Sequence, residues 1–481
     1  MVCVMGERDD IFASARRLAR AIRLGELSPS EALDTCLERV DRLNPELVAV
    51  IWRNDDDARE RARQATDRLA RTPTGERGDL PPFFGVPLPV KDLTAVAGWP
   101  VTYGSWAAPD RPSEESALVV EAFERGGFLL TGRTNTPEFG PITAAENLRY
   151  GVSRNPWDRD RTPGGSSGGA AAAVAAGMFP VAHANDGGGS IRIPASCCGL
   201  VGLKVSRGRV PNRVNSWEGG SVEGVVTRDV ADTAAVLDVI SGFDRGLWYN
   251  APPPERPFAD EVGSDPGSLR VGLVETAPFG LPLDQACLDA VRHAGQLLES
   301  LGHRVAPVSF EIRDEFLAAF LNVVNSGLAD YDDIDWDRAE PHVRANRAAA
   351  VQVDSLSYVR SVHQLQRFTR ELVVRWGTEF DVLLTPTMSI APPRAGEILA
   401  AVHEGAGGGP ALSVFQMAVF TSGFNMTGQP AVSLPTYTTE EGLPIGVQVV
   451  GGPWEEALLL RLAAQMEPAA GWLDREFPAR S

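Results

Sequence analysis

Short apolar runs alternate with helical patterns along this chain, and this alternation constrains its fold more than any other feature. The runs Phe128–Gly132 and Phe179–Ala184 are typical of short buried strands. Residues 115–125 have helical spacing, and Ala170–Ala176 is an alanine-rich run of high helix propensity. Further strands are predicted at Asp381–Pro386, Ala431–Pro435 and Ile445–Val450. Strands that alternate with helices in this way predict an α/β core.

The remaining segments predict one domain over residues 1–481, since no long linker divides the chain. Residues 1–75 are expected to form N-terminal helices, one of which begins at the capping box Ser28-Pro29-Ser30-Glu31. Residues 76–245 are expected to form the main part of the core. Residues 250–375 are expected to form a helical insertion or cap, and residues 376–470 the C-terminal core strands and helices.

Charge and cysteine content argue against several classes of protein. The chain carries 45 Lys and Arg against 63 Asp and Glu, a net charge of -18, which disfavours binding to nucleic acid or to an anionic membrane surface. The five cysteines do not form a disulfide framework, because the adjacent Cys197 and Cys198 can pair only through a strained bridge. No signal-peptide stretch and no run of 18 apolar residues is present, so we expect a cytoplasmic protein.

Three segments carry residues suited to chemistry. The first is Gly187-Gly188-Gly189-Ser190, where a serine follows glycines that let the backbone turn sharply and approach a ligand closely. Backbone N–H groups in such a turn can stabilise a developing oxyanion. The alternative interpretation is a tight turn between a strand and a helix.

The second segment is Gly164–Gly169, which has three interpretations. Its structured flanks argue against a flexible linker, and it lacks the Lys-Ser/Thr ending of a phosphate-binding loop. It also matches the nucleophile-elbow pattern twice, with Ser166 or Ser167 in the centre, but that pattern requires a histidine partner. The chain has six histidines, and none lies in a distinctive local motif.

The third segment ends in Lys91. Alternating Val86, Leu88 and Val90 predict a strand before it, and the intervening prolines predict an edge or irregular strand. A lysine after a strand is usually a solvated surface residue. To act as a base it must be neutral at pH 7, which costs about 4–5 kcal/mol unless burial lowers its pKa.

In chain order, the segments at Lys91, Gly164–Gly169 and Gly187–Ser190 resemble the amidase signature family, whose pattern is a strand-borne lysine, then G-G-S-S-G-G, then G-G-S-I-R. The resemblance covers nearly the whole chain and is weakest over residues 250–375. Other segments similar to the family are Leu27–Glu31, Leu43–Pro45, Thr134–Phe139, Cys198–Lys204 and Phe424–Pro430. It implies the family's fold, a central mixed twisted sheet with helices on both faces and a helical insertion.

The resemblance also implies roles for individual residues. Ser190 would be the nucleophile, Ser166, in a cis-peptide setting, the proton relay, and Lys91 the base. The backbone of Gly187, Gly188 and Gly189, with that of Ser190, would form the oxyanion hole. Ser167 and Asp186 would hold the loops in place. No metal and no organic cofactor are implied.

The third glycine, Gly187, departs from the G-T-D-x that precedes G-G-S in many members. Together with Ile193–Cys198, it resembles the subgroup of nylon-oligomer (6-aminohexanoate cyclic dimer) hydrolases and urethanase-type amidases. This implies small apolar amide, aryl amide, carbamate or ester substrates. Candidate lining residues are Trp217, Phe316, Phe320, Phe415 and Met417, and the loop Arg207–Gly220 is a candidate cover over the site.

Three alternative functions stay open on the sequence alone. The first is the glutaminase-type subunit of a tRNA-dependent amidotransferase, which shares the Ser-Ser-Lys site and depends on partner subunits. The second is a non-catalytic binding protein on the same fold, and the third a His-dependent α/β-hydrolase. For the favoured function we expect a small-molecule substrate, no nucleic-acid or membrane partner, and a monomer or homodimer.

Overall fold

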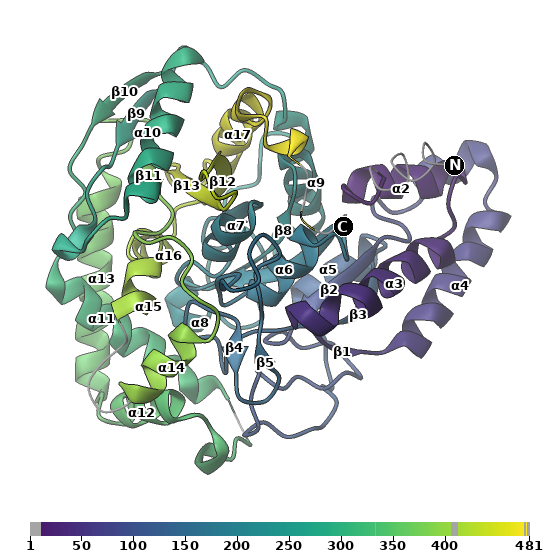
Figure 1. Cartoon of the computed structure of the whole chain (residues 1–481), viewed down its shortest axis with the longest axis horizontal. Coiled ribbons are helices and arrows are strands. Elements are labelled where there is room, and N and C mark those ends of the chain that lie inside the picture. Colours follow the sequence, from purple (N-terminus) through teal and green to yellow (C-terminus); the bar gives the residue numbers. More distant parts are fainter. Residues whose placement is uncertain (1–10, 332, 406–411, 476–477, 479–481) are drawn as a thin grey trace.

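Figure 1 shows the computed structural model, which describes residues 11–331, 333–405, 412–475 and 478. Its strands are β1 Val50–Arg53, β2 Pro87–Lys91, β3 Leu129–Thr134, β4 Glu146–Asn147, β5 Gly151–Val152, β6 Val181–Asp186, β7 Val201–Lys204, β8 Val222–Thr227, β9 Arg270–Leu273, β10 Arg304–Pro307, β11 Val382–Pro386, β12 Ala431–Thr438 and β13 Pro444–Val450. Its α-helices are α2 Ala15–Leu24, α3 Pro29–Leu47, α4 Asp55–Arg71, α5 Leu118–Arg125, α6 Gly168–Ala175, α7 Arg192–Cys198, α8 Ser216–Gly219, α9 Val230–Ile240, α10 Gln285–Ser300, α11 Asp314–Ser326, α12 Pro341–Val351, α13 Ser355–Val373, α14 Glu397–Glu404, α15 Leu412–Ala418, α16 Ser422–Thr427 and α17 Glu456–Ala470.

An eight-stranded mixed sheet forms the centre, in the order β10-β9-β11-β13-β12-β7-β8-β6. The pairs β10–β9 and β9–β11 are parallel, and the remaining neighbours are antiparallel. Strands predicted from apolar runs lie at its middle, where β11, β12 and β13 are mostly buried. The α/β prediction with a central mixed sheet is therefore confirmed.

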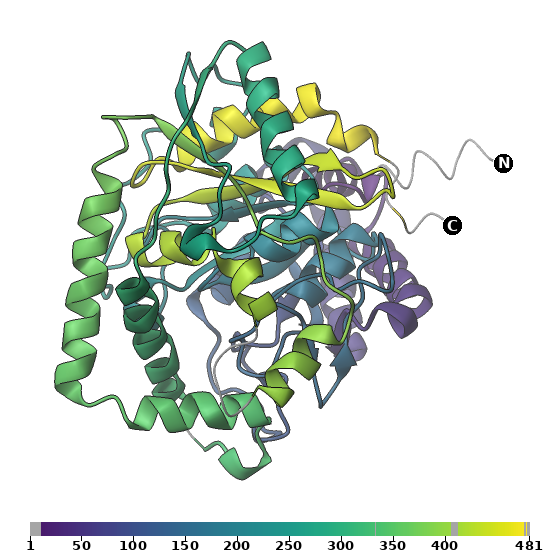
Figure 2. The same ribbon diagram turned by 60° about the vertical axis from the view of Figure 1, so that its left-hand side comes forward.

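Helices cover both faces of this sheet. On one face, Val432 and Leu434 of β12 belong to a core cluster that also contains Val291 of α10 and Leu459 of α17. Figure 2 shows the teal helix α10 and the yellow helix α17 above the strands. On the other face, α6 and α7 pack against β6 and β8 through small residues such as Ala182. Small side chains let these helices approach the sheet closely. The segments Gly164–Gly169 and Gly187–Ser190 lie at their N-termini.

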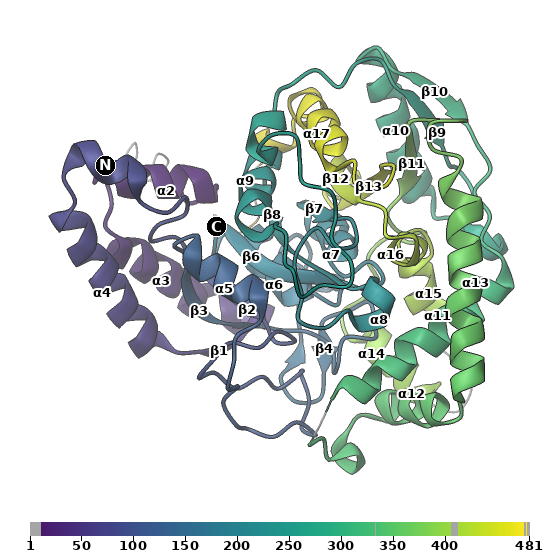
Figure 3. The ribbon, with the colours of Figure 1, turned by 180° about the vertical axis from the view of Figure 1, so that it is seen from behind.

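A separate three-stranded sheet, ordered β1-β3-β2, lies on the side of the N-terminal helices. Helix α3 begins with the predicted capping box, in which Glu31 N donates to Ser28 Oγ and Ser28 N to the Glu31 carboxylate. Figures 1 and 3 show α2, α3 and α4 at one end of the molecule, away from α11 and α13. Strand β2 lies at the sheet edge, and its pairing with β3 shifts register between Leu88 and Val90, as its prolines predict.

The segment 250–375 differs from the predicted helical insertion. It contains β9 and β10, which extend the large sheet, as well as α10, which packs onto that sheet. Only its later part, α11, α12 and α13, forms a separate helical layer. The strands escaped prediction because each has four residues and β10 is largely exposed, so neither produces an apolar run.

The described cysteines form no disulfide bond. Cys36, Cys197, Cys198 and Cys287 are free and buried, whereas Cys3 lies outside the described residues. Burial raises the pKa of the Cys198 thiol well above its usual value. Within the described ranges no helix combines the length and apolar character needed to cross a membrane.

Candidate active site

Lys91 is the last residue of β2 and is completely buried. Its Nζ lies 2.7 Å from Ser166 Oγ, 2.9 Å from Ser167 Oγ and 2.7 Å from Asn185 Oδ1. The edge strand of the small sheet thus brings the predicted base to the Gly164–Gly169 loop and to the end of β6. The structure therefore joins Lys91, Ser166 and Ser167 in one cluster and adds Asn185.

Burial favours the neutral form of the Lys91 amine, which is the form that can act as a base. It lowers the pKa of Lys91 to about 7, against the opposing effect of the Glu223 and Asp186 carboxylates. The backbone of Lys91 is also fixed, because its N–H donates to His183 Nδ1 at 3.2 Å. The other ring nitrogen of His183 lies 2.8 Å from Glu223 Oε2. A large fraction of Lys91 is therefore neutral near pH 7.

The glycine-serine loop is packed tightly between neighbouring backbones. A Cβ on Gly165 would lie 2.5 Å from Ala144 N, so only glycine fits there. The Gly165–Ser166 peptide bond is cis, as the resemblance implied. Ser167 N donates to Ser190 O at 3.2 Å, which joins this loop directly to the second serine segment.

The Gly187–Ser190 turn is held by the carboxylate of Asp186. Gly189 N donates to Asp186 Oδ1 at 2.8 Å, and Ile191 N donates to Oδ2 at 3.1 Å. The Gly189 N–H therefore points to this carboxylate and is not available as an oxyanion donor. Among the described residues, the N–H groups of Gly187, Gly188 and Ser190 have no hydrogen-bond acceptor.

Asp186 is itself paired with Arg192, and both side chains are completely buried. Arg192 Nε and Nη2 each lie 2.9 Å from an Asp186 carboxylate oxygen, in a two-pronged pair. Burial raises the pKa of Asp186, but the Arg192 charge and the hydrogen bonds of Arg192 and Asn425 outweigh it and hold that pKa well below its usual range. The guanidinium also donates to Asn425 Oδ1 and Gln448 Oε1, each at 2.6 Å.

The unusual third glycine, Gly187, is explained by the indole ring of Trp217. A Cβ on Gly187 would lie 2.1 Å from Trp217 Cζ3, and a Cβ on Gly327 would lie 2.4 Å from Trp217 Nε1. The ring therefore lies between two glycines, one before Ser190 and one at the end of α11. Trp217 has φ of 56°, so its backbone is in the left-handed region.

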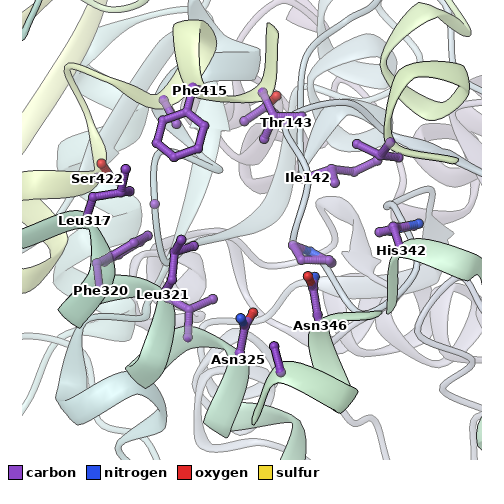
Figure 4. Close-up of a pocket in the computed structure, with 18 of the residues that line it drawn as sticks. Ile142, Thr143, Leu317, Phe320, Leu321, Asn325, His342, Asn346, Phe415 and Ser422 are labelled. Carbon is purple, nitrogen blue, oxygen red and sulfur yellow. The ribbon is translucent and has the colours of Figure 1, made fainter. Parts of the chain in front are cut away.

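A cavity of about 710 Å³ opens on one side of Ser190, and Figure 4 shows its lining. Phe320 and Leu321 of α11 and Phe415 of α15 give it an apolar wall. Asn325 at the end of α11 and Asn346 of α12 also line it. The cavity therefore suits an apolar group with few hydrogen-bonding atoms.

A second hollow of about 450 Å³ lies on the other side of Ser190 and is more polar. Ser166, Asn185 and Glu223 line it, as does Arg213 from the loop Arg207–Gly220. Ser190 and Trp217 line both spaces, so the nucleophile candidate lies where they meet.

The predicted lining residues mostly reach the larger cavity. Phe316, Phe320, Phe415 and Trp217 line it. Met417 does not, because it is completely buried in the core cluster beside α6 and α7. It follows Phe415 by two positions on the same short helix, and a helix places such residues on different faces.

Three site residues were not found from the sequence. Asn185 contacts Lys91 Nζ, His183 fixes the Lys91 backbone, and Asn425 donates to Asp186 Oδ1 at 2.9 Å. Asn185 and His183 lie just before the Gly187–Ser190 segment, at a predicted strand. This closeness in sequence could have indicated that both belong to the site. Asn425 lies in the family-like segment Phe424–Pro430, but it is more than 200 residues from Asp186, and nothing in that segment indicates this contact.

Comparison with known proteins gives consistent results. The family model described as Amidase matches residues 31–460. The 6-aminohexanoate-cyclic-dimer hydrolase of Paenarthrobacter ureafaciens is 36% identical over 97% of this chain and 96% of its own. The acylamidase of Rhodococcus erythropolis is 32% identical over 99% of each chain. A structure of 6-aminohexanoate cyclic dimer hydrolase complexed with substrate is 35% identical, has a TM-score of 0.89, and covers 97% of this chain and 99% of that chain.

Replacement of Asp186 by Asn should destabilise the protein strongly. The change leaves the buried Arg192 guanidinium without a carboxylate partner, and we expect a loss of about 3–5 kcal/mol in the free energy of unfolding. Urea unfolding monitored by circular dichroism measures it. Asp381→Asn is the matched control, because Asp381 pairs with Arg270 at the surface. This variant should lose far less of the free energy of unfolding. Equal losses for the two variants would contradict this account.

Gly187→Ala should be far more disruptive than Gly188→Ala. The new methyl group at 187 overlaps Trp217 and should lower the free energy of unfolding by about 1–3 kcal/mol. A Cβ at 188 would meet only Phe320 Cζ, at 3.8 Å. Adding Trp217→Ala should recover much of the Gly187→Ala loss, giving a non-additive double-mutant cycle in thermal or urea unfolding. Additive losses would show that Trp217 is not the obstacle.

Proposed function

This chain belongs to the amidase family, and from that premise we propose that it hydrolyses small apolar amides through an acyl-enzyme formed on Ser190. Hydrolysis of amide bonds is supported by the named relatives, which include an acylamidase. The observation that carries the finer proposal is the buried Lys91 amine, 2.7 Å from Ser166 Oγ, with a pKa lowered to about 7.

The proton path follows from the positions of these three side chains. Neutral Lys91 accepts the hydroxyl proton of Ser166, which takes the proton of Ser190 as its Oγ attacks the carbonyl carbon. Ser166 and Ser190 line the same hollow, which supports their contact during the reaction. The proton then returns through Ser166 to the amine nitrogen as the C–N bond breaks. Water attacks the acyl-enzyme by the same path and releases the acid.

The negative charge on the carbonyl oxygen requires hydrogen-bond donors. We assign this role to the backbone N–H groups of Gly187, Gly188 and Ser190, because that of Gly189 donates to Asp186. Loss of one such donor typically costs about 2.7–4 kcal/mol of transition-state stabilisation. Asp186 would thus act indirectly, by fixing the turn that presents them.

The two spaces around Ser190 suggest how the substrate lies. Ser166, which returns the proton to the leaving amine, lines the smaller hollow and not the larger cavity. The amine should therefore lie in the smaller hollow, and the acyl group in the apolar cavity beside Phe320 and Phe415. Aryl amides with apolar acyl groups fit both spaces. Aryl carbamates and esters belong to the same proposal, because Ser190 would attack their carbonyl carbon in the same way.

Replacement of Ser190, Ser166 or Lys91 should abolish hydrolysis of p-nitroanilides with apolar acyl groups. We expect kcat/KM to fall by about 10⁴-fold or more for Ser190→Ala, because residues of a catalytic triad act as a unit. Lys91→Met preserves the size of the buried side chain. We expect its kcat/KM, and that of Ser166→Ala, to fall by a similar factor. Ser268→Ala changes an exposed serine and is the control. Retained activity in Ser190→Ala would exclude Ser190 as nucleophile and favour Ser166 or Ser167.

The pH dependence of kcat/KM should report the Lys91 amine. Its pKa is lowered by burial to about 7, so the protonated, inactive form predominates below that pH and the neutral base above it. With an uncharged substrate, kcat/KM should fall about tenfold per pH unit below about pH 6 and level off above about pH 8. Circular dichroism at each pH separates unfolding from titration. A rise that continues toward pH 10 would show an unperturbed lysine.

A further inference from the structure

Glu340, His342 and His403 form a cluster beside the apolar cavity. Glu340 and His342 flank Pro341, the first residue of α12, and His403 lies near the end of α14. Their ligand atoms, one from each side chain, all lie within 4.8 Å of one another. His342 also lines the cavity, as Figure 4 shows. The proposed amide hydrolysis uses none of these residues.

His342 has an unusual environment for a buried histidine. Its side chain is 7% exposed, and neither ring nitrogen has a hydrogen-bond partner among the described residues. A buried polar group without a partner costs about 1–3 kcal/mol, so such groups are rare and call for an explanation. Glu340 Oε2 lies 3.6 Å from His342 Nδ1 and 3.0 Å from His403 Nε2, so a single carboxylate oxygen faces both imidazoles.

The surroundings hold the Glu340 carboxylate in position. Its other oxygen accepts a hydrogen bond from Leu148 N at 2.7 Å, and Glu340 N donates to Glu138 Oε2 at 2.6 Å. Two buried carboxylates therefore lie close together, with Arg344 as the nearby positive charge. A bound cation would stabilise the carboxylate, and the neutral imidazole is the form that binds metals.

We propose that Glu340, His342 and His403 bind one divalent transition-metal ion, with Zn²⁺ as the best fit. Two imidazoles and one carboxylate are a common ligand set for zinc. Zinc bond lengths of about 2.0–2.2 Å place tetrahedral ligand atoms roughly 3.3–3.5 Å apart, close to the distances from Glu340 Oε2. The widest pair, at most 4.8 Å apart, must close by up to about 1.5 Å, and His403, whose side chain is 23% exposed, has room to rotate.

The ion would serve structure and not the reaction. It would join the start of α12 to the end of α14, two helices whose residues line the apolar cavity. Asn346 and Ala349 of α12 and Val402 of α14 are among those lining residues. A cross-link there would fix this wall of the cavity, and the fourth ligand position would be left to water. The Ser190 chemistry needs no metal, so the two proposals stand independently.

Zinc titration of the untagged full-length protein, stripped with EDTA and dialysed into metal-free buffer, tests this site. By isothermal titration calorimetry we expect one Zn²⁺ per chain for wild type. His342→Gln and His403→Gln should bind at least about 100-fold more weakly, because loss of an outer-shell partner alone costs about 10–100-fold. His363→Gln, which changes an exposed histidine of α13, should bind as wild type does.

Thermal unfolding with EDTA and with Zn²⁺ separates lost binding from lost folding. Zinc should raise the melting temperature of wild type and His363→Gln but not that of the two site variants. The partly exposed His403 makes His403→Gln the variant that should remain folded in EDTA. Wild type that binds Zn²⁺ no more tightly than His403→Gln would overturn the proposal.

Discussion

The buried pair of Asp186 and Arg192 is the interaction on which the rest of the site depends. The carboxylate orders the turn that carries Ser190, through the N–H groups of Gly189 and Ile191. The guanidinium reaches Asn425 after β11 and Gln448 on β13. Such a pair stabilises the fold only when every remaining hydrogen-bonding atom is satisfied, and here the surrounding segments satisfy them. The ion pair therefore connects the reactive turn to the centre of the large sheet.

A second constraint is that the groups of the proposed active site come from two different sheets. Lys91 ends a strand of the small sheet, whereas Asn185 lies near the end of β6 of the large one and Ser190 follows that strand. The amine can be neutral near pH 7 only because the contact between these layers excludes water from it and lowers its pKa. Packing between the two sheets thus determines the pKa of Lys91. A change that loosened this contact would raise the Lys91 pKa without touching any reactive atom.

Local patterns predicted the central strands and the capping box, because each depends on residues near one another in sequence. The association of Lys91 with Ser166, which lie 75 positions apart, was implied by the family resemblance and not by a local pattern. Other features depend on distant partners. The need for glycine at 187 follows from Trp217 in a later loop, and the carboxylate at 340 meets a histidine more than 60 residues away. The short strands β9 and β10 are defined by their neighbours in the sheet and carry little apolar pattern of their own. Sequence periodicity cannot predict contacts between residues so far apart in the chain.

Trp217 has a consequence for how a protein of this kind can change over generations. Its indole ring borders both spaces around Ser190 and is held by Gly187 and Gly327. A mutation that enlarges one space at this position also alters the other, so preferences for the two halves of a substrate are not inherited as independent traits. Mutations at 187, 217 and 327 should show strong epistasis, and the order in which they arise would determine which variants remain functional.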